Sequence, residues 1–196
     1  MMNIRILILM IVLPSLICCT SENGQGQQKV EKETGQKLHQ SPQKLPLGDL
    51  TDEQEFRKTL ENLKGTLKQK NLKKIASLLN YPFYTSHKEV PNGIGVPADP
   101  ISLTEFDNYK SAIFNADVMR ILPLFKEDNL SEIDEKTDEV YYQSLKKLTD
   151  TGSKMYEVYM QYPESNTQAE SYFSFIFGKV NGQFKILSTY AKWPVK

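Results

Sequence analysis

Apolar residues recur at helical spacing just after residue 50. They follow one another at intervals of three or four, which places them on one face of an α-helix. Thr51 stands three residues before Gln54, the arrangement of a capping box, so the helix is expected to begin there. A second, shorter helix is predicted over residues 72–79, because the residue before Pro82 is driven out of the α region. The apolar positions of the first helix are Phe56, Leu60, Leu63 and Leu67.

The middle of the chain alternates between short elements and turn-forming residues. Residues 82–85 are compatible with a short strand, and residues 91–100 contain three prolines and two glycines, which predicts a loop. A helix is expected from residue 104 to residue 122, with Phe106, Tyr109 and Ile113 on one face. The acidic residues 127–139 indicate a solvated loop.

The last third of the chain has the composition of β-strands. Residues 155–162 and 170–180 are rich in aromatic and β-branched side chains. Asn181-Gly182 separates the second run from a third. Both residues tolerate a positive φ, so a two-residue hairpin turn is predicted there. Residues 140–142 (VYY) fit a strand or a helix equally well.

The first 18 residues have the pattern of a signal peptide. One cation, Arg5, precedes an apolar run over residues 6–13, which is shorter than the ~20 residues that a membrane span needs. Residues 16–19 (LICC) resemble the lipobox of bacterial lipoproteins, although Cys18 stands where a smaller residue is usual. The resemblance implies that Cys19 carries acyl chains such as palmitate. An uncleaved anchor and a soluble periplasmic product are the alternatives.

Residues 20–48 predict a disordered tether. They contain six Gln, four Gly and no aromatic residue, so they cannot bury enough apolar surface to offset the entropy lost on ordering. The expected organisation is therefore a signal peptide (residues 1–18), lipidated Cys19 with a tether (residues 19–48) and one α+β domain (residues 49–196).

Charge and cysteine content exclude several classes of function. The chain has 24 basic and 24 acidic residues, which is unlike the one-sided basic surface of proteins that bind nucleic acid. The two cysteines, Cys18 and Cys19, are adjacent and lie before the domain, so the folded part holds no disulfide, thiolate metal site or catalytic thiol. No cofactor-binding motif is present.

The order of these elements resembles the nuclear-transport-factor-like fold, part of the cystatin-like superfold. The resemblance rests on residues 78–83 (LLNYPF), which end the second helix, and on the closing residues 177–186 (FGKVNGQFKI). It implies an α+β domain in which N-terminal helices pack in a strongly curved antiparallel sheet, forming a cone with a pocket. It also implies similarity to small exported bacterial proteins without an assigned activity, and the fold itself hosts both enzymes and ligand carriers.

One histidine of the domain is a candidate for catalysis. His87 is the natural general base near neutral pH, but it stands in a polar stretch before the predicted loop. The alternative is a solvated loop residue. With one histidine and no cysteine, the domain offers no typical metal-ligand set, so no metal is expected.

Alternate aromatic residues are the candidates for a pocket lining. Phe173, Phe175 and Phe177 share one face of a predicted strand, and Tyr109 lies on the helix predicted from residue 104. They line an apolar pocket in the cone, or they pack against the helices as core residues.

Two classes of function remain open. The first is a cell-envelope lipoprotein with a non-enzymatic binding or interaction domain, anchored at the outer membrane or facing the periplasm. The alternative is a small-molecule enzyme or lipophilic-ligand carrier that uses the cone pocket. The partners expected are the membrane, through the lipid, and an unknown small molecule or envelope protein. A homodimer through the sheet is a further option, and nucleic acid is not expected.

Overall fold

A computed structural model describes residues 50–196, with the exception of residues 92, 127–130, 165–166 and 168. The predicted signal peptide, the lipidation site Cys19 and the tether all lie outside the described residues. Among the residues described, no helix is both long and apolar enough to cross a bilayer.

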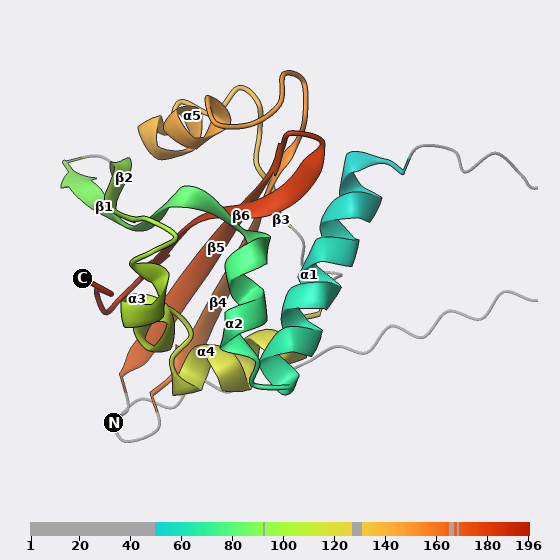
Figure 1. Cartoon of the computed structure of the whole chain (residues 1–196). Helices are drawn as coiled ribbons and strands as arrows, with labels where there is room; N and C mark the ends of the chain where they lie inside the picture. The colour runs from blue at the N-terminus through green and yellow to red at the C-terminus, as the bar shows by residue number, and fades with distance from the viewer. Residues whose placement is uncertain (1–49, 92, 127–130, 165–166, 168) are drawn as a thin grey trace, which may run out of the picture. The chain divides into compact units, whose positions relative to one another are not determined.

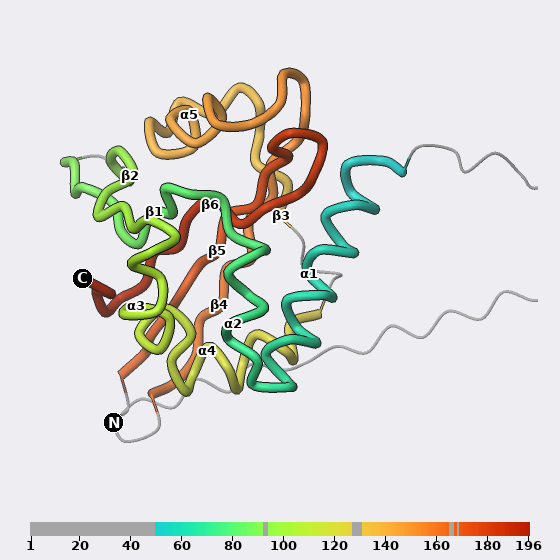
Figure 2. Tube along the Cα trace, in the orientation of Figure 1, coloured from blue at the N-terminus to red at the C-terminus, as the bar shows by residue number. Residues whose placement is uncertain are grey.

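The first helix begins where the capping box predicts. The Gln54 backbone N–H donates to Thr51 Oγ1 at 3.3 Å, and the Thr51 N–H donates to Gln54 Oε1 at 3.0 Å. Two of the N–H groups that a helix start leaves unpaired are therefore satisfied. Figure 2 shows the chain passing from this helix through a short second helix directly into the first strand. The helices are α1 (Asp52–Lys68), α2 (Leu72–Ile75), η1 (Ala76–Leu78), α3 (Phe106–Ile113), α4 (Ala116–Ile121), η2 (Leu122–Leu124) and α5 (Val140–Lys146).

Six strands form one sheet (Figure 1). Neighbouring strands are antiparallel, except that β1 and β6 run parallel. The predicted class, α+β with helices packed in a curved sheet, is confirmed, and the parallel pair is a departure from the purely antiparallel sheet expected. In spatial order the strands are β2 (Gly93–Ile101), β1 (Leu79–Val90), β6 (Gln183–Ala191), β5 (Glu170–Val180), β4 (Met155–Pro163) and β3 (Ser131–Glu132).

The two faces of the sheet carry separate hydrophobic clusters. The inner face packs against α1 to α4, where Phe56 of α1 stacks on Tyr156 of β4 with ring centroids 4.4 Å apart. The outer face is covered by α5, whose Tyr141 and Leu145 are fully buried against Ile176 and other strand residues. The segment 140–142, ambiguous in the sequence, is thus helical and supplies the cover of the outer face.

The predicted loop at residues 91–100 is wrong, because most of it forms strand β2. Among the described strands, β2 lies at the edge of the sheet and pairs with β1 alone, and a proline without an N–H is tolerated at an edge. Pro97 pairs with His87, and Pro100 pairs with Tyr84. Gly95 allows the two strands to approach, since a Cβ there would lie 2.0 Å from the Lys88 carbonyl oxygen.

The hairpin at Asn181-Gly182 is confirmed. Val180 pairs with Gln183, and the two residues between them have φ values of 51° and 75°. Phe177 pairs with Ile186, and Phe175 pairs with Thr189. Both phenylalanines belong to the inner hydrophobic cluster, together with residues of the helices, so the aromatic face of β5 points at the helices as predicted.

Candidate functional site

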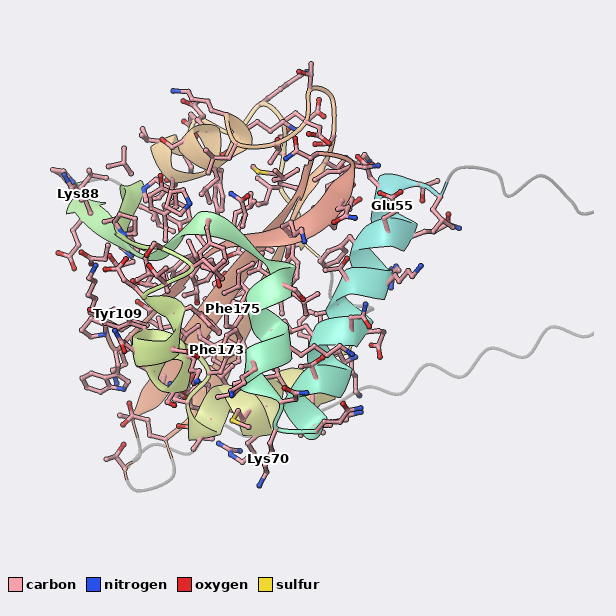
Figure 3. All side chains as sticks on the ribbon, in the orientation of Figure 1. Glu55, Lys70, Lys88, Tyr109, Phe173 and Phe175 are labelled. Carbon is pink, nitrogen blue, oxygen red and sulfur yellow. The ribbon has the colours of Figure 1, made fainter. Side chains whose placement is uncertain are left out.

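The three phenylalanines predicted as pocket or core residues lie in the inner core. Phe173 is 2% exposed, and Phe175 and Phe177 are fully buried. Phe175 stacks on Phe114 with ring centroids 5.5 Å apart, and Phe177 meets Phe56 edge to face at 5.0 Å. Figure 3 shows Phe173 and Phe175 among the side chains between the sheet and the helices. Rings from the strands and helices fill this part of the interior.

Tyr109, the fourth candidate, lies on α3 at the rim of this core. It is partly buried against the inner cluster, and the Lys196 ammonium lies 5.5 Å from the centroid of its ring. Figure 3 places it at the edge of the domain, away from Phe175. It therefore does not join the phenylalanines in one cavity lining.

His87 lies in strand β1, so its interpretation as a solvated loop residue is wrong. Its ring is half-buried and meets Tyr190 edge to face at 5.6 Å and Tyr141 at 6.2 Å. Its Nδ1 is buried and has no hydrogen-bond partner among the described residues. A general base needs a partner that orients it, and this nitrogen has none.

Glu157 of β4 receives three hydroxyl donors on the outer face. The Tyr190 hydroxyl donates to Oε1 at 2.6 Å, and the Tyr142 hydroxyl donates to Oε2 at 3.0 Å. The Ser174 hydroxyl also donates to Oε1. These four residues, together with His87, Tyr141 and Ser188, are called the tyrosine–glutamate cluster below. It joins β4, β5, β6 and α5 through one carboxylate.

Burial keeps the tyrosines of this cluster protonated. Desolvation raises the pKa of Tyr190 and of Tyr142, and the Glu157 charge raises both further. Burial also raises the pKa of Tyr141, whose hydroxyl interacts with that of Ser188 without forming a well-shaped hydrogen bond within the described chain. Hydroxyls held in this way donate to Glu157 and do not serve as bases near neutral pH.

Glu157 and its donors are not among the site residues predicted from the sequence. Glu157 interrupts an aromatic strand and alternates with Tyr159, so it shares the outer face of β4. That alternation was the available signal. The donors could not be found in the same way, since Ser174 and Tyr190 meet only through the register of β5 and β6.

Three cavities are lined by residues that the structure describes, and none of these three includes Phe173, Phe175 or Phe177. The first, of about 290 Å³, lies between residues 133–137 and α5. The second, of about 330 Å³, lies between α1 and the β5–β6 hairpin tip. The third, of about 140 Å³, lies between α5 and the β1–β2 pair. Within the described part of the chain, no His, Cys, Asp and Glu side chains gather in a way that could hold a metal ion.

No protein-family model and no curated protein matches the sequence. Among solved structures, the chain is similar to the beta subunit of a benzoate 1,2-dioxygenase from Burkholderia mallei. The identity is 9%, the match covers 72% of this chain and 90% of that one, and the TM-score is 0.38.

Two further solved structures show a comparable likeness. One is described as a calcium/calmodulin dependent protein kinase II association domain from Xanthomonas campestris, at 15% identity over 70% of this chain and 84% of that one, with a TM-score of 0.34. The other is described as a scytalone dehydratase from Novosphingobium aromaticivorans, at 13% identity over 70% and 80%, with a TM-score of 0.31. The architecture assigned above rests on the element order and the sheet order of this chain itself.

Proposed function

We propose that this chain is an exported, lipid-anchored protein of the bacterial cell envelope whose domain, residues 49–196, is a non-enzymatic binding or interaction module. The proposal for the anchor rests on the signal-peptide pattern and on Cys19 in residues 16–19. The membrane is the first partner, through the lipid. An envelope protein or a small molecule at the domain surface is the second.

The filled interior of the domain carries this proposal. A carrier or enzyme of the cone type needs a hollow between the helices and the sheet, lined by apolar side chains with a few converging polar groups. Here Phe175 stacks on Phe114 in that place, and Phe56 packs against Tyr156 and Phe177. The tyrosine–glutamate cluster lies instead on the outer face, around Glu157.

The tyrosine–glutamate cluster does not favour acid–base chemistry either. The Glu157 oxygens already accept three hydroxyl hydrogens, and the tyrosines that donate them have a raised pKa because they are buried. This arrangement ties four elements together. It supports a rigid surface on which binding residues are displayed.

Binding of an apolar probe tests whether the interior is filled. Benzene and a fluorescent lipophile should not bind the native protein, whereas Phe175→Ala should bind benzene, because deleting a buried ring leaves an apolar cavity. Isothermal titration calorimetry measures the binding of each probe to the native protein and to the variant. Phe175→Leu removes less volume and serves as a variant that folds if the alanine variant does not.

The carrier alternative makes the opposite prediction. It requires the native protein to bind the lipophile, and it requires Phe175→Trp to block that binding by filling the hollow. Either result would overturn the proposal for the domain, while leaving the lipid anchor to its own test.

A further inference from the structure

The cavity between residues 133–137 and α5 has a fixed apolar floor. Met155, at the start of β4, is only 3% exposed, and the Ile133 N–H donates to the Met155 carbonyl oxygen at 3.0 Å. Both side chains line the cavity, as does Tyr142. The Tyr142 hydroxyl is held by Glu157, so the floor and one wall are anchored to the sheet.

Charges of both signs surround this floor. Asp134 and Glu135 line the cavity from the loop, and Lys146 and Lys147 line it from the C-terminal end of α5, where Lys147 is the C-cap. No ion pair within 4.0 Å joins these acids to these lysines in the part of the chain that is described.

The lysines differ in their surroundings. The Lys146 ammonium donates to the Ser153 carbonyl oxygen, whereas the Lys147 ammonium makes no hydrogen bond or ion pair with any residue that the structure describes. The two acids and the two lysines therefore line one cavity without forming an ion pair with each other among the described residues.

We propose that this cavity binds a small zwitterionic molecule with an apolar body, which is the chemistry of a free apolar amino acid. The inference rests on the proposed binding function and specifies a ligand class for it. The volume of the cavity, about 290 Å³, lies near the lower limit for ligand pockets, which favours a small molecule. Two acids and two lysines balance in charge, so a ligand with separated charges is favoured over an anion or a cation.

The orientation of the ligand follows from the two sides of the rim. Its carboxylate lies toward Lys146 and Lys147, its ammonium toward Asp134 and Glu135, and its apolar side chain on Met155 and Ile133. Each charge of the ligand thus meets the opposite charge of the protein, and its apolar part leaves water.

Three related probes test this assignment on the whole chain. L-Phenylalanine carries both charges, N-acetyl-L-phenylalanine lacks the ammonium, and L-phenylalaninamide lacks the carboxylate. Calorimetry should show that the zwitterion binds tighter than either analogue, on the order of tenfold. The Met155 methyl signal, in protein labelled at its methionine methyl groups, should shift with the same saturation curve. Met155→Leu identifies that signal.

Two charge variants separate the contributions of the rim. Lys147→Gln should weaken binding of L-phenylalanine and of the N-acetyl analogue and leave the amide unchanged. Glu135→Gln should weaken binding of L-phenylalanine and of the amide and leave the N-acetyl analogue unchanged. Lys136→Gln and Asp138→Asn make the same charge changes at exposed residues beside the cavity, so they control for long-range electrostatics and should leave all three affinities unchanged.

Several outcomes would overturn the ligand assignment. These are an unmoved Met155 signal up to about 10 mM L-phenylalanine, equal affinities for the three probes, or equal effects of the rim and control variants. If this occurs while lipophiles still fail to enter the native interior, the assignment falls and the proposed function stands. Entry of lipophiles into the interior would overturn the proposed function itself.

Discussion

Gly182 gives the sharpest test at the scale of a single residue. Its φ is 75°, and a Cβ added there would meet no atom within 4 Å. Substitution therefore acts through backbone strain alone, which costs about 1–3 kcal/mol for a residue forced into this region. We expect Gly182→Val to lower the free energy of unfolding, measured by urea denaturation, by that amount.

Gly65 in helix α1 supplies the matched comparison. A Cβ there also meets no atom within 4 Å, but its backbone is helical. Gly65→Ala should raise stability by about 0.5–1 kcal/mol, because alanine loses less entropy on folding than glycine. Gly182→Ala should lower it. Equal effects of the two alanine substitutions would contradict the strain at the turn.

At the scale of elements, buried and partly buried tyrosines on both faces of the sheet should make the domain sensitive to alkali. Burial raises the pKa of Tyr81 and Tyr156 to about 12, and it raises the pKa of Tyr141, Tyr142 and Tyr190 as well. A tyrosine in the unfolded chain has a pKa of about 10. Above that pH the unfolded chain binds fewer protons than the folded one, so stability falls as pH rises.

The size of this alkaline effect can be measured directly. Each tyrosine that stays protonated in the fold contributes a slope of about −1.4 kcal/mol per pH unit between ~10 and its folded pKa. Urea denaturation at several pH values should give a steep loss, and Tyr190→Phe should reduce the slope by about one tyrosine's share. If ultraviolet absorbance shows that all ten tyrosines titrate at about pH 10 in the folded protein, the protection inferred for these residues is absent.

At the scale of the whole molecule, the lipid anchor predicts where the protein is found. Cells given a radioactive fatty acid should label the protein, and Cys19→Ser should abolish the label, because the acylated sulfur is lost. Two or more acyl chains hold a protein stably at a bilayer, so the wild-type protein should remain with the membrane fraction. Cys18→Ser is the matched control and should keep the label. Label lost only in Cys18→Ser would assign the lipid to the other sulfur.

Local signals in the sequence determined the elements whose geometry depends on a few neighbouring residues. The capping box of Thr51 and Gln54 and the turn at Asn181-Gly182 are both present as predicted. In each case the deciding interactions lie within a few residues of one another, so the local sequence contains the necessary information. The inward direction of Phe175 and Phe177 followed as well, since alternate strand residues share a face.

Only the tertiary structure decided the features that depend on pairing between distant segments. Strand β2 forms among prolines and glycines because β1 supplies its hydrogen-bonding partner, and residues 140–142 are helical because α5 buries Tyr141 on the outer face. Glu157 meets Tyr142 and Tyr190 only after the strands have taken their register. The surface cavity depends in the same way on a loop and a helix brought together over β4, since contacts between residues far apart in the chain have no signature in local spacing.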